Sequence, residues 1–465
     1  MDYHNLLSRL HACHIGVLLG VVLLAGCAPV PPVPTATPPP APTSSLPVHE
    51  IEVNPERTMQ TIEDVAGGNF VHRFGGVREA LDPVSRFTLE NLSPRYVRVN
   101  MTLEDWEPVN DDPDPNAFNW DAFHEANFIP GTISFLKTMQ ERAGTGPVIA
   151  SIWDVPDWMV TNPHAERERR LDPDLYPEVV ETIAAWLLHA RDTHGVTIAY
   201  VSFNEATLGV NVRLNPDEAA DLISIAGPRF EDLGLSTKWL LGDCHNMGSC
   251  GLYVKALYAY EGIRPYLGPL AFHSWDARVP DQTLIRLGEF AEENGLEIWC
   301  TEAGWQSQLW ETPEQYPTWQ NAMSIATIYS RVLKLSGTTV LHYWQMMGGD
   351  YAINDGRAGY PVFHILRQYA DQFPQGTVIV ETSADQNRVH ALAGQAPDHF
   401  VVQVINSAFT DLFVTLSGLP PGSYTHIRST SEEAGTTVGT YEITDGSVGL
   451  EMPRGSVNVL TTRRP

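Results

Sequence analysis

Basic residues are scarce in this sequence. Its 465 residues include 29 Lys and Arg against 56 Asp and Glu, which gives a formal net charge of −27. A charge of this sign is repelled by the phosphate backbone of nucleic acid and by an anionic lipid surface. We therefore expect no nucleic-acid partner, whereas the charge is compatible with neutral ligands.

The sequence also lacks an apolar run long enough for a comfortable transmembrane helix. The apolar run near the N-terminus covers only residues 15–24, as in an export signal. It continues into Leu-Ala-Gly-Cys, which resembles the bacterial lipoprotein signal, in which the cysteine carries the lipid. Residues 1–27 are therefore predicted to be a lipoprotein-type signal peptide. The protein would be extracytoplasmic and would contact a membrane only through lipid on Cys27. An uncleaved anchor and a plain secretion signal are the alternatives.

Residues 28–48 are rich in Pro, Ala, Thr and Ser. Proline fixes the φ angle and removes a backbone donor, so this composition predicts a semi-extended linker. Such a linker would hold a folded body away from a membrane surface.

Cysteine is the next scarcity, because only three remain after the signal: Cys244, Cys250 and Cys300. Outside the cytoplasm, Cys244 and Cys250 could close a short disulfide loop. Metal binding with His245 is the weaker alternative because no other ligand has zinc-like spacing. The run NDDPDPN at 110–116 could bind calcium, but turn chemistry explains it as well. We expect no metal site and no cofactor, and Cys300 is expected to be a buried strand residue.

No Gly-x-Gly-x-x-Gly turn follows the first strand-like segment, which disfavours an open doubly wound sheet. Between residues 61 and 374, short apolar runs alternate with segments of helical periodicity. Eight such repeats predict a TIM (β/α)8 barrel, and the chain is long enough for this barrel and a smaller domain. The predicted strands are DVAGGNF near 64, RYVRVN at 95, PVIASIW at 147, IAYVSFN at 198, KWLLGD at 238, LAFHSW at 270, LEIWCTE at 296 and TVLHYW at 339.

Helix boundaries are marked by capping residues. The clearest helix has apolar residues at i, i+3 and i+4 and is predicted to stop at Gly195. Another is predicted to begin after Asn215 as the N-cap, with Pro216 in its first turn.

The pattern changes after residue 374. Residues 375–465 contain short runs of period two, separated by Gly, Pro, Asn and Asp turns, with no helical segment between them. This pattern predicts an all-β domain, a sandwich, to which a strand at 49–60 is expected to add.

Two glutamates stand at the ends of predicted strands four and seven, Glu205 and Glu302. Catalytic side chains of a TIM barrel lie at the carboxyl ends of its strands, so the two carboxylates are expected to face one substrate atom. Paired carboxylates with aromatic neighbours are typical of the active sites of glycoside hydrolases.

Other strand-end residues are candidates for substrate binding. Aromatic faces suit sugar rings, and Trp153 and Trp344 are the strongest aromatic candidates. Arg98 and His273 could instead be a buried counter-ion and an ordinary core histidine. Asp154 and Asp243 are expected to be cleft or loop residues rather than catalysts. The substrate-binding candidates are Arg98, Trp153, Asn204, His273, Trp275, Tyr343 and Trp344, and further tryptophans near the expected cleft are Trp158, Trp305 and Trp310.

Four motifs make the chain resemble the clan A glycoside hydrolases, most closely family 30. They are SFNEA, IWCTEAGW, QTIEDVAGGNF and ASIWDVPDWM. The resemblance covers about 49–465 and implies a barrel with a C-terminal β-sandwich. It also implies that Glu205 is the acid/base and Glu302 the nucleophile of a retaining double displacement. Departures from the family pattern in the first and third strands put the first subsite and the substrate in doubt.

The sequence thus predicts a retaining β-glycoside hydrolase whose partner is a carbohydrate, either a polysaccharide or a glycoconjugate. A non-catalytic carbohydrate-binding surface lipoprotein on an inactive barrel is the alternative from another class. A transglycosylase is the alternative among enzymes. The sugar, the linkage and endo or exo action depend on loops whose conformation the sequence does not give.

Overall fold

The structure is a computed structural model that describes residues 46–71, 82–142, 144–385 and 387–463. The predicted signal peptide, Cys27 and the linker up to residue 45 lie outside the described residues, so those predictions stand as sequence hypotheses. Among the described helices, none is both long and apolar enough to cross a membrane.

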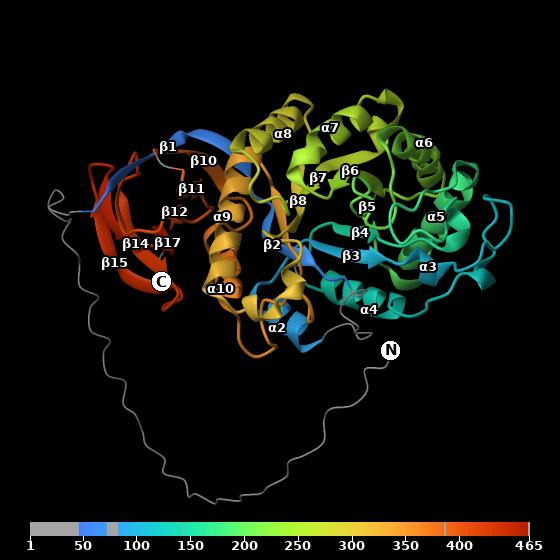
Figure 1. Ribbon diagram of the computed structural model, residues 1–465, viewed down its shortest axis with the longest axis horizontal. Helices are drawn as coiled ribbons and strands as arrows, with labels where there is room; N and C mark the ends of the chain where they lie inside the picture. The colour runs from blue at the N-terminus through green and yellow to red at the C-terminus, as the bar shows by residue number, and fades with distance from the viewer. Residues whose placement is uncertain (1–45, 72–81, 143, 386, 464–465) are drawn as a thin grey trace, which may run out of the picture. The chain divides into compact units, whose positions relative to one another are not determined.

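Eight parallel strands close into a barrel (Figure 1), which confirms the TIM-barrel prediction. Hydrogen-bonded neighbours follow chain order around the barrel, and the last strand closes onto the first. Each strand overlaps the run that the sequence predicted for it. The strands are β2 (Asp64–Asn69), β3 (Val97–Met101), β4 (Val148–Ile152), β5 (Tyr200–Phe203), β6 (Lys238–Cys244), β7 (Leu267–His273), β8 (Ile298–Ala303) and β9 (Val340–Tyr343).

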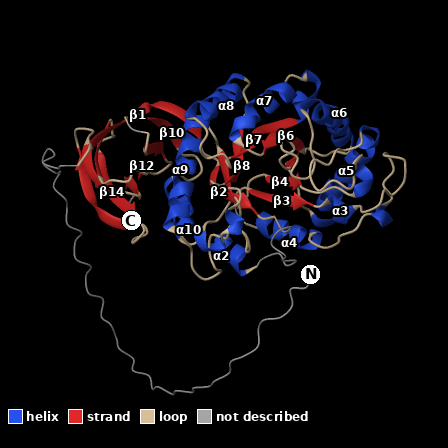
Figure 2. Cartoon of the chain, in the orientation of Figure 1, coloured by secondary structure: helices blue, strands red, loops and turns tan. Residues whose placement is uncertain are grey.

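Helices cover the outside of the barrel (Figure 2). Gly195 ends α5 as predicted, with a φ of 69° that glycine adopts without steric cost. Asn215 caps α6 as predicted and forms a reciprocal capping box with Glu218. The α-helices are α2 (Pro83–Asn91), α3 (Leu103–Trp106), α4 (Ile129–Gln140), α5 (Tyr176–His194), α6 (Pro216–Asp232), α7 (Met247–Tyr258), α8 (Asp281–Glu293), α9 (Trp319–Ser336) and α10 (Pro361–Gln372).

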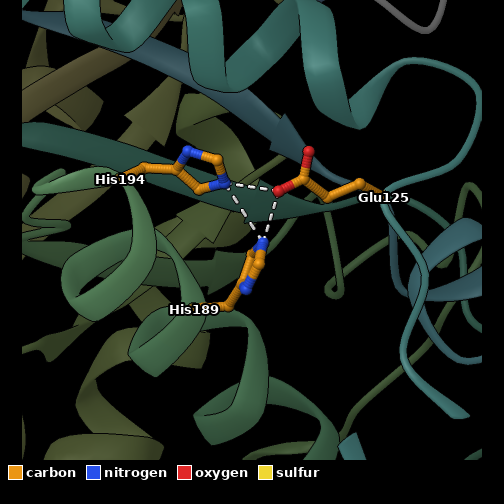
Figure 3. Close-up of side chains that lie close together, drawn as sticks. All are labelled: Glu125, His189 and His194. Carbon is orange, nitrogen blue, oxygen red and sulfur yellow. Dashed lines mark hydrogen bonds and ion pairs between the residues drawn. The ribbon is translucent and has the colours of Figure 1, made fainter. Parts of the chain in front are cut away.

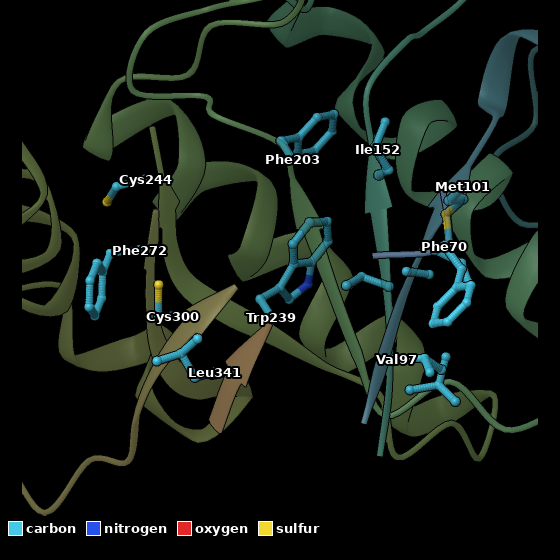
Figure 4. Close-up of a cluster of buried hydrophobic side chains, with 14 of the residues drawn as sticks. Phe70, Val97, Met101, Ile152, Phe203, Trp239, Cys244, Phe272, Cys300 and Leu341 are labelled. Carbon is cyan, nitrogen blue, oxygen red and sulfur yellow. The ribbon is translucent and has the colours of Figure 1, made fainter. Parts of the chain in front are cut away.

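Successive side chains of a barrel strand alternate between the helix layer and the barrel interior. In β3, Val97, Val99 and Met101 belong to the apolar layer between strands and helices (Figure 4). The intervening Arg98 and Asn100 are also buried and therefore face the interior. The barrel thus carries a polar layer inside an apolar shell.

Aromatic side chains close the barrel below this polar layer. The ring of Trp299 meets Tyr96 edge-on at 5.6 Å between ring centroids and Tyr200 at 5.1 Å. The polar layer therefore opens only toward the carboxyl ends of the strands. The remaining residues of this apolar cluster are Ile149, Leu240, Ala271 and Val340.

The second region is a nine-stranded, mostly antiparallel sheet that forms the β-sandwich. The N-terminal strand β1 (Val48–Thr61) lies inside it, antiparallel to β10 and parallel to β13. The strand order is β15-β14-β17-β12-β11-β10-β1-β13-β16. The C-terminal strands are β10 (Val378–Ala384), β11 (Val389–Gln395), β12 (Phe400–Asn406), β13 (Leu412–Ser417), β14 (Gly422–Ser429), β15 (Thr436–Ile443), β16 (Val448–Met452) and β17 (Ser456–Thr461).

Only Ile62 and Glu63 separate the sandwich strand β1 from the barrel strand β2. The Ile62 amide donates to the Thr377 carbonyl at 2.8 Å, at the point where the chain returns to the sheet. The indole nitrogen of Trp319 on α9 also donates to the Gly455 carbonyl at 2.7 Å. Backbone and side-chain bonds therefore join the sheet to the barrel.

Candidate active site

A cleft of about 710 Å³ lies at the carboxyl ends of the barrel strands. The two candidate catalytic glutamates line it, together with side chains that follow several different strands. The lining includes Trp153, Asn204, Glu205, His245, Asn246, Trp275, Asp276, Glu302, Trp310, Trp344, Gln345, Asp350 and Tyr351.

The two glutamates reach the cleft from the fourth and seventh strands of the barrel. Glu302 lies within β8 and is 3 % exposed, whereas Glu205 follows β5 and is half-buried. Glu205 has a left-handed φ of 50°, a strain of about 1–3 kcal/mol of the kind that clusters at functional sites. One carboxylate oxygen of each glutamate and Nδ1 of His273 all lie within 4.8 Å of one another. The structure thus brings together the pair that the strand ends predicted.

Arg98 lies directly beneath the cleft and is completely buried. Its Nη1 donates to Glu302 Oε1 at 2.7 Å and to Asn69 Oδ1 at 2.8 Å. Its Nη2 donates to Asn204 Oδ1 at 2.7 Å and to Asp243 Oδ2 at 2.8 Å. The remaining Nε donates to Ser151 at 2.8 Å. All five N–H groups of the guanidinium are therefore used, and Arg98 fixes the position of Glu302.

Asp243 is the carboxylate around which the buried layer is organised. Its Oδ1 accepts hydrogen bonds from Thr301 at 2.6 Å and from Nε2 of His273 at 3.2 Å. Its Oδ2 accepts from Ser202 at 2.6 Å as well as from Arg98. Burial raises the pKa of Asp243, but Arg98 and His273 outweigh burial and hold this pKa below its ordinary range. Asp243 is therefore an ionised anchor, not the cleft or loop residue expected from sequence.

His273 connects this anchor to both glutamates. Its Nδ1 lies 3.0 Å from Glu205 Oε1 and 3.2 Å from Glu302 Oε2. Burial lowers the pKa of His273, but the charges of Glu302 and Asp243 and the bond to Glu205 raise it to about 9. At neutral pH the ring is an imidazolium that donates from both nitrogens.

Glu302 accepts N–H donors on both of its oxygens. Arg98 donates to Oε1, and the indole nitrogen of Trp275 donates to Oε2 at 3.1 Å. Burial raises the pKa of the Glu302 carboxyl above its ordinary value, although His273 and Arg98 act in the opposite direction. Because Arg98 and Trp275 can only donate hydrogen, the ionised form of Glu302 satisfies them best.

Aromatic rings form the walls of the cleft. Trp153 and Trp344 lie with ring centroids 6.0 Å apart, and the Arg98 guanidinium lies 4.5 Å from the Trp153 ring. Trp310 stands at the entrance with 51 % of its surface exposed. These flat apolar faces are suited to stacking against sugar rings.

Some predicted positions are wrong. Tyr343 is 1 % exposed and its hydroxyl donates to the Tyr351 carbonyl at 3.3 Å, outside the cleft lining. Side chains alternate along β9, and the register turns Tyr343 toward the helices while Trp344 reaches the cleft. Trp158 and Trp305 also lie outside the lining, because they donate to the Glu107 carbonyl and to Asn321 instead.

Other residues were missed or left open by the sequence. Asn69 accepts from Arg98 and donates to the Thr301 carbonyl, a role hidden in the glycine-rich segment of the first strand. Tyr351 lines the cleft from the loop after β9, where no periodicity marks it. Cys244 and Cys250 form a disulfide, the pairing that the sequence offered, and Cys300 is buried in β8 as expected.

The acidic segment 110–116 forms turns. Oδ1 of Asp112 accepts the Asp114 amide at 2.8 Å, and Oδ1 of Asp114 accepts the Asn116 amide at 3.2 Å. Turn chemistry therefore accounts for Asp112 and Asp114, whereas a carboxylate oxygen of Asp111 lies within 4.8 Å of oxygens of Glu178 and Glu181. Within the cleft, Glu205, His273 and Glu302 also converge, and Arg98 already pairs with Glu302 there.

No protein-family model and no curated protein matches the sequence. Solved structures do match. A GH30 endoxylanase from Clostridium papyrosolvens C71 is 15 % identical with a TM-score of 0.68, over 89 % of this chain and 100 % of that chain. A family 30 subfamily 8 xylanase from Clostridium acetobutylicum is 15 % identical with a TM-score of 0.69, over 89 % and 99 %. An endo-β-1,6-glucanase is 17 % identical with a TM-score of 0.62, over 90 % and 94 %. The chain therefore has the barrel-and-sandwich fold of glycoside hydrolase family 30 in clan A.

Proposed function

We propose that this protein is a retaining β-glycoside hydrolase that acts on a polysaccharide or a glycoconjugate. The main support is the pair of glutamates at the barrel mouth, whose nearest carboxylate oxygens lie within 4.8 Å of each other. Retaining enzymes separate their carboxyl groups by about 5–5.5 Å, whereas inverting enzymes leave about 6.5–9.5 Å for a water molecule. The tryptophan walls of the cleft support a sugar as the ligand.

In the first step, Glu302 attacks the anomeric carbon while Glu205 donates its proton to the departing oxygen. The bond from the anomeric carbon to the leaving group breaks, and a glycosyl ester forms on Glu302. Arg98 and Trp275 hold the two oxygens of Glu302 during this attack. In the second step, Glu205 takes a proton from water, and the water oxygen bonds to the same carbon as the ester bond to Glu302 breaks. Glu302 becomes a carboxylate again, and the sugar leaves with its β configuration retained.

His273 is suited to follow the charge between the two glutamates. Its Nδ1–H lies at similar distances from Glu205 and Glu302, 3.0 and 3.2 Å. When Glu302 becomes an ester it loses its charge, and Glu205 gains one by giving up its proton. The same N–H can therefore stabilise whichever carboxylate is charged, without movement of the ring. Asn204, fixed through Oδ1 by Arg98, leaves its amide nitrogen as the polar group for a sugar hydroxyl.

The experiment that tests this proposal is trapping with an activated 2-fluoroglycoside, followed by peptide mass spectrometry. We expect one label on Glu302, and we expect Glu302→Gln to abolish turnover. A protein that binds sugar without labelling would be the carbohydrate-binding alternative, and near-wild-type turnover in Glu302→Gln would exclude the mechanism. Xylan and β-1,6-glucan are the first polysaccharides to assay, because structures with this fold include enzymes named for them.

We also propose that the protein is tethered outside the cytoplasm by lipid on Cys27. The support is the apolar run at 15–24, the Leu-Ala-Gly-Cys sequence and the Pro-rich linker. Globomycin-sensitive processing and a lipid mass on Cys27 are the expected results, and a soluble product cleaved elsewhere would contradict them.

A further inference from the structure

Three side chains converge on the outer surface of the barrel, apart from the cleft. Glu125, His189 and His194 point their polar atoms at one another (Figure 3). Oε1 of Glu125 lies 2.5 Å from Nε2 of His189 and also contacts Nε2 of His194. The two Nε2 atoms are 3.2 Å apart. His189 and His194 lie near the end of α5, and the chain reaches Glu125 before α4 begins.

We propose that Glu125, His189 and His194 bind a divalent transition-metal ion of the zinc type. Zinc forms bonds of about 2.0–2.1 Å to imidazole nitrogen, so two nitrogen ligands of a tetrahedral ion lie about 3.3 Å apart. The observed 3.2 Å fits this value. Two imidazoles and one carboxylate are ligands that zinc takes in proteins, and three protein ligands leave a fourth position to water.

Hydrogen bonding alone explains the arrangement less well. If both histidines donated from Nε2 to the same Glu125 oxygen, the two N–H groups would confront each other at 3.2 Å. A cation placed between three lone pairs removes that conflict, and the carboxylate needs to retreat by only about 1 Å to reach a bond length to zinc.

The surroundings of His189 suit a metal ligand. Nδ1 of its ring lies 3.2 Å from the Thr193 hydroxyl, which can accept the Nδ1–H and leave the Nε2 lone pair for the ion. The indole of Trp106 packs on the same ring at 5.0 Å between centroids. Glu125 and His189 also line a hollow of about 470 Å³ walled by Trp106, Trp120 and Phe123. These contacts orient the ring before an ion arrives.

The positive charge of Lys137 disfavours metal binding by His194, and this effect provides a sharp test. Its ammonium lies 3.0 Å from Nδ1 of His194, which holds the proton of that ring on Nε2. A metal on Nε2 requires the proton on Nδ1, where it would face the ammonium, so Lys137 must move aside. Replacing Lys137 by Gln supplies an oxygen that can accept the Nδ1–H, and this change should tighten metal binding.

The ion would tie together segments that are 64 and 69 residues apart in the chain. None of the three residues lines the cleft. We therefore expect binding to raise the melting temperature, as does any ligand that prefers the folded state, without altering the chemistry at the cleft.

The test uses the purified mature protein after chelator treatment, titrated with Co²⁺ and then with Zn²⁺. We expect one equivalent of Co²⁺ with the visible absorption bands of a four-coordinate ion, its displacement by Zn²⁺, and a rise in melting temperature. His189→Ala and His194→Ala should each weaken binding at least about tenfold. His164→Ala, an exposed histidine outside the cluster, is the matched control and should bind like wild type.

Two outcomes would overturn the site. The first is equal binding in wild type and in both ligand variants, and the second is an affinity that falls in Lys137→Gln, because removing an ammonium beside a metal-bound imidazole must reduce repulsion. Circular dichroism without metal checks that each variant folds. Glu125→Gln, which keeps the side-chain shape, takes the place of a histidine variant that does not fold and should also weaken binding.

Discussion

Two groups of buried carboxylates in this molecule differ in whether they have positively charged partners. Beneath the cleft, Asp243 and Glu302 are neutralised by Arg98 and His273 and receive a hydrogen bond on every oxygen. Within α5, Glu178 and Glu181 are 6 % and 2 % exposed, and among the described residues no Lys, Arg or His forms an ion pair with either. Oε2 of Glu178 and Oε1 of Glu181 have no hydrogen-bond partner within the part of the chain that the structure describes.

The difference shows how burial acts with and without a partner. A buried charge is costly unless it is paired and hydrogen-bonded, and an unpaired acid instead takes up a proton. Burial, with the charge of Asp111 and the adjacent Glu178, raises the pKa of Glu181 to about 9. Burial also raises the pKa of the nearby Glu107 to about 7. The group beneath the cleft keeps its charges, whereas burial within α5 drives Glu181 toward its uncharged, protonated form.

Glu205 shares His273 with the group beneath the cleft, and removing the proton that Glu205 donates should have the largest effect. Glu205→Gln should lower kcat/KM about 10²–10⁴-fold on substrates with poor leaving groups, because general acid catalysis contributes on that scale. The loss should be far smaller on activated aryl glycosides, whose leaving groups need no proton. Steady-state kinetics on both substrate types provide the measurement. An equal loss on both types would mean that Glu205 does not act as the acid.

Replacing Arg98 should leave the carboxylates beneath the cleft with His273 as their remaining positively charged partner. Arg98→Met leaves Asp243 and Glu302 buried beside His273 alone, and breaking one partner of a buried ion pair typically costs about 3–5 kcal/mol. We expect the free energy of unfolding to fall by about that amount, measured by denaturant titration.

Arg98→Lys is the matched control for charge. It keeps the charge but not the five donors, so its loss of stability should be intermediate. Stability in Arg98→Met equal to that of wild type would show that the network does not depend on the guanidinium.

The two groups also differ in how much of each the sequence could predict. Eight apolar runs specified the barrel strands, and glutamates at two strand ends specified the catalytic pair. The sequence did not reveal that a register shift beside Asp243, with its φ of 52°, turns that carboxylate into the buried layer. Strand-end aromatics were equally ambiguous, because period-two alternation allows a residue such as Tyr343 to face either side.

Clusters between distant segments were out of reach for another reason. Glu181 lies in α5, and the sequence pattern of that helix does not distinguish Glu181 from an ordinary surface glutamate. Its charge becomes unfavourable because Glu181 packs against the segment around Asp111. Likewise, the spacing of His189 and His194 does not indicate that Glu125, which lies more than sixty residues earlier, is their neighbour. Such sites require knowledge of which surfaces meet, and that knowledge comes from the tertiary structure.

The smallest effect concerns the unpaired group and depends on pH. Because burial raises the pKa of Glu181 in the folded state to about 9, the folded protein retains a proton that the unfolded chain releases above its ordinary pKa. The stability contributed by this proton is complete below that ordinary pKa and is lost as pH rises toward 9. Glu181→Gln mimics the protonated form, so it should stabilise the protein by about 1–3 kcal/mol at pH 8 and little at pH 4.

Denaturant unfolding across pH 4–10 in chelator measures this difference, with Glu231→Gln, at an exposed position of α6, as the control that should show none. A gain that does not grow with pH would contradict the protonated state of Glu181. In Glu181→Gln, the free energy of unfolding should still decrease as the pH approaches 9, and this remaining decrease is expected from His273. Its raised pKa gives stability that is complete below the ordinary histidine value and is lost as the ring deprotonates through about 9. The two groups of carboxylates should therefore be separable in one set of curves, because only the group without a cation responds to this substitution.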